Sequence, residues 1–169
     1  MRIALVSALA LSISACAKKK PEDLPPPPAT TAPAPSTEAP MPSTSTGTVP
    51  GSRADFLAQA GTDTIFFGTD GYDVDAEDQA TLSRQAEWLA KFPNVSVTVE
   101  GHADERGTRE YNLALGERRA NAAKNYLVSQ GVSASRLSVI SYGKERPVAS
   151  GSDEASWAQN RRAVTVVPN

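Results

Sequence analysis

The sequence predicts an α/β (α+β) two-layer sandwich, in which helices pack on one face of a mixed four-stranded sheet. Between residues 63 and 167, two amphipathic helical segments alternate with short segments rich in valine, isoleucine and phenylalanine. Such alternation is typical of domains that cover a sheet with helices. The predicted order is strand, helix, strand, helix, strand, strand. The residues from Ser52 onward are enough for one domain with a single core.

The first half of the domain shows three elements. A strand is expected over residues 63–67, followed by a turn rich in glycine and aspartate. Residues 75–91 predict a helix, because acidic residues crowd its first turn and Pro93 follows its end. Valine alternates with polar residues over 95–99, which indicates a half-buried strand that ends at Gly101.

The second half continues the alternation. A long amphipathic helix is expected over residues 109–130, with Gly131 as its C-terminal cap. A third strand is predicted over 136–142, then a helical turn near Trp157 and a last strand over 163–167. One sequence does not determine the order of these strands within the sheet.

A charged residue lies on the face of the long helix that should pack against the sheet. At about 100° per residue, Arg119 falls in the middle of the apolar arc. Because a guanidinium cannot lose its charge there, Arg119 needs an anion, and Asp104 in the preceding loop is the nearest candidate. Two interpretations stay open. One is a structural ion pair between the two residues, and the other is a pocket for a ligand that carries both an ammonium and a carboxylate.

The start of the chain predicts export and a lipid anchor. A positively charged beginning precedes an apolar run over residues 3–15, which is too short for a permanent membrane span and typical of a signal peptide. The run ends in Ile-Ser-Ala-Cys, which resembles the lipobox of bacterial lipoproteins. We therefore expect a signal peptide over residues 1–15 and lipidation at Cys16, the only cysteine. Ala17 after it favours the outer membrane, by resemblance to bacterial sorting rules.

A proline-rich segment follows the predicted anchor. Ten of the 13 prolines lie between Pro21 and Pro50, interleaved with Thr, Ser and Ala. Such a segment cannot bury enough apolar surface to fold, so residues 16–51 are expected to form a lipidated start and an extended tether, and residues 52–169 the domain. The net charge of −2 and the lack of a basic stripe argue against nucleic acid as a partner.

Four stretches of the domain carry a resemblance to a known family. They are FFGTDGYDVD from Phe66, GHADERGTREYNLALGERRA from Gly101, SYGKERP from Ser141 and NRRAV from Asn160. With the lipobox and the tether, they closely resemble the OmpA-like family of peptidoglycan-binding domains, and within it the peptidoglycan-associated lipoproteins. The resemblance covers roughly residues 61–167 and implies a βαβαββ domain that binds the cell wall.

The resemblance implies a non-covalent complex with peptidoglycan stem peptides that carry diaminopimelate. In this complex Asp104 would receive the ammonium of the diaminopimelate end, and Arg119 would receive its carboxylate. The turn after the first strand would form the opposite wall, although relatives often have an aromatic residue where this chain has Thr69. The implied site residues are Thr69, Asp70, Gly71, Asp104, Asn112, Leu115 and Arg119.

The resemblance also implies a place and partners for the chain. It would be anchored in the outer membrane through Cys16, with its domain in the periplasm. There it would tie the membrane to the wall and bind TolB, as part of the Tol system that draws the outer membrane inward during cell division. Peptidoglycan and TolB are expected to compete for the surface around Asp104.

Two alternatives are a peptidoglycan hydrolase and a purely protein-docking adaptor. His102 is the only histidine, so a catalytic zinc site lacks ligands, and such a residue at a strand end is more typical of a hydrogen-bonded structural role. Neither a nucleophile elbow nor an H-E-x-x-H or phosphate-binding motif occurs. Asp104 and Glu105 are adjacent, so their side chains should diverge rather than form a catalytic pair. The sequence therefore predicts a binding protein without a cofactor or metal.

Two further groups of residues are expected to be structural. Asn160, Arg161 and Arg162 are interpreted as a capping and salt-bridge cluster that holds the last strand. The aromatic residues expected in the core are Phe66, Phe67, Trp88 and Tyr126.

Overall fold

The computed structural model describes residues 48–168, so the signal peptide, the lipid anchor at Cys16 and most of the predicted tether lie outside the described residues. The elements are α1 (Arg53–Ala60), β1 (Thr64–Phe66), α2 (Ala76–Lys91), β2 (Val97–His102), α3 (Arg109–Ser129), the 3₁₀ helix η1 (Ala134–Arg136), β3 (Leu137–Gly143), α4 (Glu154–Asn160) and β4 (Arg162–Val166). The predicted order of strands and long helices is confirmed. Within residues 48–168, no helix is both long and apolar enough to cross a bilayer.

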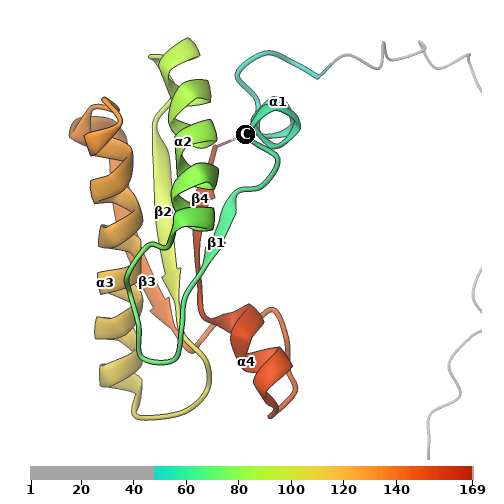
Figure 1. Cartoon of the computed structure of the whole chain (residues 1–169), viewed down its shortest axis with the longest axis vertical. Coiled ribbons are helices and arrows are strands. Elements are labelled where there is room, and N and C mark those ends of the chain that lie inside the picture. The colour runs from blue at the N-terminus through green and yellow to red at the C-terminus, as the bar shows by residue number, and fades with distance from the viewer. Residues whose placement is uncertain (1–47, 169) are drawn as a thin grey trace, which may run out of the picture. The chain divides into compact units, whose positions relative to one another are not determined.

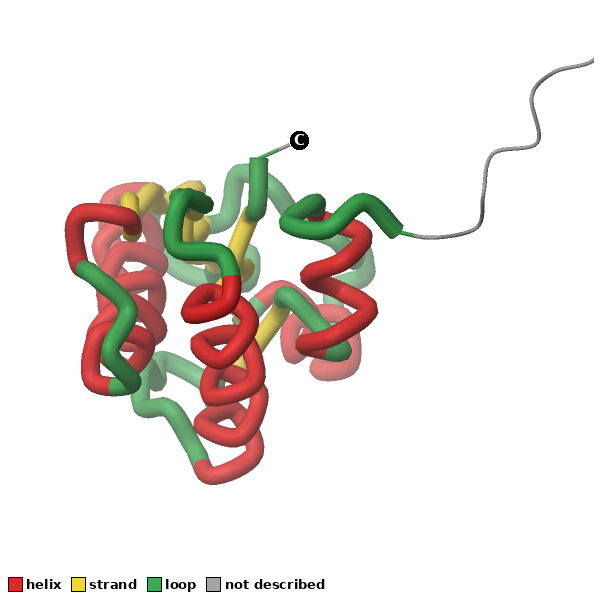
Figure 2. The backbone as a smooth tube through the Cα atoms, turned by 90° about the horizontal axis from the view of Figure 1, so that it is seen from above, coloured by secondary structure: helices red, strands yellow, loops and turns green. Residues whose placement is uncertain are grey.

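The four strands form one mixed sheet in the order β1-β4-β2-β3. β4 is antiparallel to both of its neighbours, whereas β2 and β3 are parallel. The helices α2 and α3 lie on the same side of the strands (Figure 1), and the view from above shows them as a layer of their own (Figure 2). The predicted α/β sandwich with helices on one face is confirmed.

The core lies between the sheet and the two long helices. Large side chains that are at most 1% exposed come from every layer: Phe56, Ile65, Leu82, Trp88, Leu89, Val99 and Leu127. Burying each such side chain contributes roughly 1.5–3 kcal/mol. Of the aromatic residues expected there, Phe67 is also buried and Tyr126 packs against the core. Phe66 is exposed, because alternation along β1 turns it away from the buried Ile65.

Helix α1 was not predicted; it is only eight residues long, with Phe56 and Ala60 in the hydrophobic core and Leu57 packed against it. Its caps are nevertheless visible in the sequence. The Ser52 hydroxyl accepts a hydrogen bond from the backbone N–H of Asp55, and Gly61 ends the helix with a φ of +83°. The buried Asp55 carboxylate also accepts from the indole N–H of Trp88, which fixes α1 to α2.

The crossing of α3 over the sheet depends on two glycines. A Cβ atom on Gly101 of β2 would overlap the carbonyl oxygen of Gly116 on α3, and one on Gly116 would overlap the Ser141 hydroxyl. The expected end of β2 at Gly101 is wrong by one residue, because His102 continues the pairing with β3 after a register shift. The close crossing holds the first turns of α3 against the end of the sheet.

Candidate ligand-binding site

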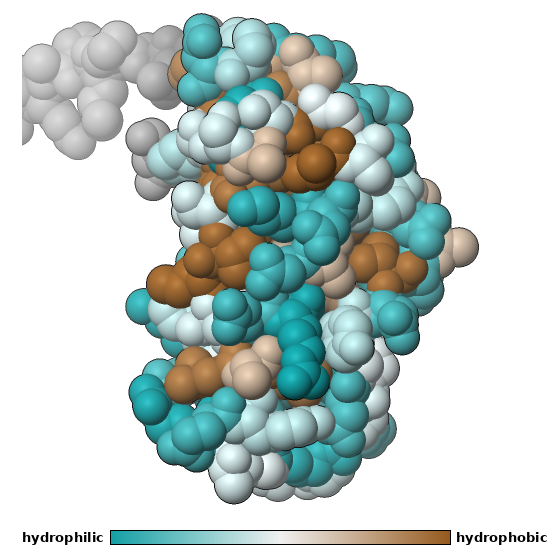
Figure 3. Space-filling model, turned by 90° about the vertical axis from the view of Figure 1, so that its left-hand side faces the viewer, coloured by the Kyte–Doolittle hydropathy of each residue, from teal (hydrophilic) through white to brown (hydrophobic). Residues whose placement is uncertain are grey.

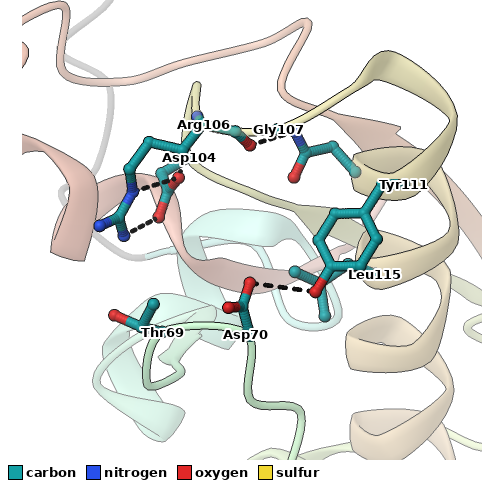
Figure 4. Close-up of a pocket in the computed structure, with 8 residues that line it drawn as sticks. Thr69, Asp70, Asp104, Arg106, Gly107, Tyr111 and Leu115 are labelled. Carbon is teal, nitrogen blue, oxygen red and sulfur yellow. Dashed lines mark hydrogen bonds and ion pairs between the residues drawn. The ribbon is translucent and has the colours of Figure 1, made fainter.

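A pocket of about 310 Å³ lies where the loops after β1 and β2 meet the first turns of α3 (Figure 4). Its lining residues are Thr69, Asp70, Asp104, Arg106, Gly107, Tyr111, Asn112 and Leu115. Five of the seven residues that the sequence analysis assigned to the site therefore meet here. Arg106, Gly107 and Tyr111 were not assigned, while Gly71 and Arg119 do not line the pocket.

Asp104 is 7% exposed and is held by two arginines. Its Oδ1 accepts from the backbone N–H and the Nε of Arg106 at 3.1 and 3.0 Å, and its Oδ2 accepts from Nη2 at 2.7 Å. Nη1 of Arg161 lies 3.6 Å from the same Oδ2. Burial by itself raises the pKa of Asp104, but the hydrogen bonds and charge of Arg106 and the charge of Arg161 outweigh it. The pKa therefore stays below its usual range, and Asp104 is ionised at neutral pH.

Arg119 is fully buried beneath this site. Its Nε donates to the carbonyl of Gly71 at 2.8 Å, Nη1 to that of His102 at 2.9 Å, and Nη2 to that of Gly68 at 3.0 Å. The ion pair with Asp104 that the sequence suggested is absent from the described part of the chain, since Arg106 and Arg161 engage that carboxylate instead. Backbone carbonyls, rather than an anion, satisfy the buried guanidinium.

The position of Arg119 gives it two effects on the pocket. Its hydrogen bonds connect the loop of Gly68 and Gly71 to the end of β2, so it fixes the two walls relative to each other. Burial lowers its pKa to about 10, while the charges of Asp104 and Asp70 act in the opposite direction. The guanidinium is still charged at neutral pH. Within residues 48–168 it has no carboxylate oxygen within 4.0 Å, so its positive charge acts beneath the pocket.

Asp70 and Tyr111 form the side of the pocket that faces Asp104 and Arg106 (Figure 4). Asp70 has a φ of +54°, in the left-handed region that aspartate tolerates in turns. Its Oδ1 accepts from the Tyr111 hydroxyl at 3.0 Å, and this hydrogen bond raises the pKa of Tyr111. The Asp70 side chain thus bonds to α3 at this side of the pocket.

The first turns of α3 supply the remaining wall. Thr108 caps the helix by accepting from the N–H of Tyr111 at 3.2 Å. The buried Asn112 donates from Nδ2 to the carbonyl of Arg106 at 2.7 Å, which holds the loop after β2 against the helix. Leu115 is 4% exposed and contributes an apolar surface. One side of the pocket is therefore apolar and the others carry charge.

A ring of four alternating charges supports Asp104 from the side of α4. Arg106 and Asp104 are 2.7 Å apart, Asp104 and Arg161 3.6 Å, Arg161 and Glu154 2.8 Å, and Glu154 and Arg106 4.0 Å. The Arg106 guanidinium also lies 4.2 Å from the centre of the Trp157 ring. The sequence did not predict this ring, because two of its members lie in the loop after β2 and the other two in α4 and its C-cap, about fifty residues further along the chain.

The cluster of Asn160, Arg161 and Arg162 is confirmed as a capping and ion-pair cluster. Asn160 accepts from the N–H of Val148 at 2.8 Å, and Arg161 donates to the carbonyl of Phe67 at 3.0 Å. Arg162 donates to the carbonyl of Arg146 at 3.2 Å. The ion pairs of Arg161 with Glu154 and Asp104 extend this cluster to the pocket.

His102 is buried and contributes its backbone, rather than its ring, to the surroundings of the site. The ring stacks on Tyr142 with 5.6 Å between centroids. Contrary to the expectation of a hydrogen-bonded histidine, neither ring nitrogen has a hydrogen-bond partner among the described residues, and Nε2 lies 3.7 Å from a carboxylate oxygen of Glu100. Burial, with the charges of Arg162 and Arg146, lowers the pKa of His102 to about 4, so the ring is neutral at pH 7. In residues 48–168, no cluster of His, Cys, Asp and Glu could hold a metal ion.

Comparison with known proteins agrees with the fold and the pocket. The model of the OmpA family matches residues 66–161. The peptidoglycan-associated lipoprotein of Rhizobium meliloti (strain 1021) is 53% identical over 165 residues, which cover 98% of this chain and 85% of the relative. The chain therefore belongs to the OmpA family and, within it, to the family of peptidoglycan-associated lipoproteins.

Solved structures give the same result. The crystal structure of the peptidoglycan-associated lipoprotein from Burkholderia pseudomallei has a TM-score of 0.64 and 43% identity, and the match covers 68% of this chain and all of that chain. The cell wall anchor of the T6SS from Pseudomonas aeruginosa has a TM-score of 0.58 and 27% identity, over 72% of this chain and all of that chain.

Proposed function

We propose that this chain is an outer-membrane lipoprotein that binds diaminopimelate-containing stem peptides of peptidoglycan without a covalent bond, and so ties the membrane to the wall. The observation that carries the proposal is the charge arrangement of the pocket. Two acids, Asp70 and Asp104, and one arginine, Arg106, line a cavity of small-molecule size, and the charge of Arg119 lies beneath it. The names of the similar proteins, which refer to peptidoglycan and the cell wall, agree with this proposal.

A zwitterionic amino-acid end fits this arrangement. Its ammonium would bind between Asp70 and Asp104, and its aliphatic stem would pack on Leu115. The positive charge of Arg119 would attract its carboxylate from beneath the pocket, and the family resemblance also implies a role for Arg119 at that carboxylate.

A pull-down with washed peptidoglycan sacculi tests the proposal. Asp104→Asn removes the negative charge that the ligand ammonium would pair with, so we expect about 2–5 kcal/mol of lost binding. Asp73→Asn is the matched control, because Asp73 is exposed and does not line the pocket. If Asp104→Asn binds sacculi as tightly as wild type, the proposed site is wrong.

We further propose that the chain binds peptidoglycan without cleaving it. Asp104 is ionised and paired with Arg106, which makes it a poor general acid. The neighbouring Glu105 accepts a hydrogen bond from the indole N–H of Trp157, and Glu105 does not line the pocket. We expect a suspension of sacculi to keep its turbidity during prolonged incubation with the full chain. A fall in turbidity beyond that of a buffer control would support the hydrolase alternative.

Binding of TolB, and through it a role in the Tol system, is a separate proposal that follows from the family resemblance. The exposed rings of Tyr72 and Tyr111 lie on the loop and the helix that border the pocket, so a protein seated on them would cover the opening. Saturating TolB should therefore release the full chain from sacculi. Simultaneous saturation of the chain by both partners would contradict a shared surface.

A further inference from the structure

A second hollow, with a volume of about 530 Å³, lies beside the pocket around Asp104. It is formed by Tyr72, in the loop after β1, and by the solvent side of α3. Its lining residues on α3 are Ala114, Glu117, Arg118, Asn121, Ala122 and Asn125. The hollow shares no lining residue with the pocket around Asp104, so the two are separate depressions of the surface. The proposed function leaves this one unused.

The floor of the hollow is apolar and its border is polar. Ala114, Arg118 and Ala122 follow one another at intervals of four residues, so they lie on one face of α3. The two alanines carry only methyl groups and leave a trough on either side of the arginine. Asn121 and Asn125 stand along the edge of this trough with their amide groups. The trough thus offers an apolar surface beside groups that donate and accept hydrogen bonds.

The polar groups of the hollow suit a neutral ligand. Glu117 and Arg118 are adjacent and of opposite charge, and within residues 48–168 neither forms an ion pair. Their charges cancel, so the hollow has no net attraction for an ion. Nδ2 of Asn121 donates to the backbone carbonyl of Glu117 at 2.9 Å, which orients the amide and leaves its Oδ1 available to a ligand donor.

Tyr72 supplies an aromatic wall. Its side chain is 45% exposed, and the guanidinium carbon of Arg118 lies 6.0 Å from the centre of its ring. A sugar ring has a face of C–H groups and an edge of hydroxyl groups. An aromatic ring can pack on the face, while planar polar side chains bind the edge. The combination of Tyr72 with the two amides is therefore suited to a sugar.

The hollow follows directly on the pocket along both elements that form them. On α3, Ala114 lines the hollow and the next residue, Leu115, lines the pocket. In the loop after β1, which runs beside α3 (Figure 4), Tyr72 is two residues from Asp70 of the pocket. Since successive Cα atoms are about 3.8 Å apart, a ligand of a few residues can reach from one depression into the other.

We propose that the hollow beside Tyr72 binds the N-acetylated sugar to which the stem peptide of peptidoglycan is attached. The ring of Tyr72 packs on the C–H face of the sugar, and the amides of Asn121 and Asn125 bind its hydroxyl and acetamido groups. This inference rests on the proposed function, because the stem peptide bound around Asp104 brings the sugar to the hollow.

The covalent link between peptide and sugar determines how much the hollow contributes. Once the peptide is bound, the sugar is held beside the hollow at an effective concentration on the order of millimolar. A contact that is too weak to retain a free sugar at micromolar concentration then strengthens binding of the linked ligand. Glycan without peptide lacks this advantage, so it should bind poorly by itself.

Calorimetric titration of the full chain with two soluble ligands tests the inference. One is a diaminopimelate stem peptide, and the other is the same peptide still joined to its disaccharide. Wild type should bind the joined ligand at least about fivefold more tightly. Ala114→Gln fills the hollow from an exposed helical position, so it should remove most of this difference and leave the affinity for the free peptide unchanged. Ala80→Gln is the matched control, since Ala80 is also an exposed helical alanine and lines neither depression.

The outcomes separate the inference from the function on which it rests. If wild type binds both ligands equally, the sugar makes no contact and the inference is wrong, while the proposed function stands. The inference is also wrong if Ala114→Gln keeps the wild-type difference, or if it weakens both ligands by the same factor. If wild type binds neither ligand, the proposed function fails, and the inference fails with it.

Discussion

Arg119 is the residue whose role the structure changes most. Its position on a helical wheel predicted burial, but not its partners, because these are carbonyls of Gly68, Gly71 and His102. Two of those carbonyls lie about fifty residues earlier in the sequence, in a loop whose path the sequence did not determine. A periodic pattern can locate a buried charge on a helix. The groups that satisfy the charge depend on the tertiary structure.

The hydrogen bonds of Arg119 to three backbone carbonyls should stabilise the fold. Arg119→Met should lower the free energy of unfolding by about 3–5 kcal/mol, because it leaves three carbonyls without their donor. The neighbouring Arg118 is exposed, so Arg118→Met should change stability by less than about 0.5 kcal/mol. Urea unfolding of both variants measures the difference. If Arg119→Met kept wild-type stability and lost only peptidoglycan binding, its main role would be direct contact with the ligand.

Because the pKa of His102 is lowered on folding, the free energy of unfolding should depend on pH. The unfolded histidine takes up a proton near pH 6.5, whereas the folded one does so only near pH 4, so its contribution is complete above pH 6.5 and is lost as the pH falls toward 4. The loss should reach at most about 3 kcal/mol. His102→Phe keeps the stacking on Tyr142 and removes the titration, so it should flatten the dependence in urea unfolding between pH 7 and pH 4.5. Equal slopes for both proteins would contradict the assignment.

At the scale of elements, the glycine crossing between β2 and α3 determines where the pocket residues of α3 lie. Gly101→Ala should destabilise the domain by about 1–3 kcal/mol or more, because its Cβ would overlap the backbone of Gly116. Displacement of α3 should also weaken binding to sacculi. A Cβ on Gly68 meets no atom within 4 Å, so Gly68→Ala is the control. Thermal unfolding of the two variants checks this, and equal midpoints would show that α3 does not need the close approach.

The sequence predicted the main elements of the fold, because apolar periodicity and caps are local signals. The valine alternation of β2 and the acidic start of α2 are examples. The insertion of β4 between β1 and β2 has no such signal, since it depends on long-range pairing. The pocket also could not be predicted in full from the sequence, because some of its contacts are long-range. Asp104 was visible beside its helix, whereas the pairing of Arg106 with α4 requires the chain to bring together residues about fifty positions apart.

At the scale of the whole molecule, the pocket and the start of the domain lie at opposite ends. Residues 48–52 and α1 are at the upper end in Figure 1, while the loops that line the pocket and α4 are at the lower end. The face that bears α3 is mainly hydrophilic, with separate hydrophobic patches (Figure 3). A domain connected to a membrane through its first residues can thus direct its pocket away from the point of attachment.

The proposed lipid anchor at Cys16 can be tested in the full chain. We propose that residues 1–15 are a signal peptide, that Cys16 is lipidated and that the segment up to residue 51 acts as a tether. Cys16→Ser should shift the chain from the membrane fraction to the soluble periplasmic fraction, because no acyl chains could then be attached. Binding of the purified chain to sacculi should not change. Retention of Cys16→Ser in the outer membrane would contradict anchoring through this residue.

The central claim is that the wall is recognised through the amino-acid end of its stem peptide in the pocket around Asp104. Competition tests it most directly: the full chain is bound to sacculi, and the released fraction is measured as soluble ligand is added. Diaminopimelate stem peptides should release the chain, and glycan strands stripped of peptide should not. Release by bare glycan strands, with none by the stem peptide, would contradict it.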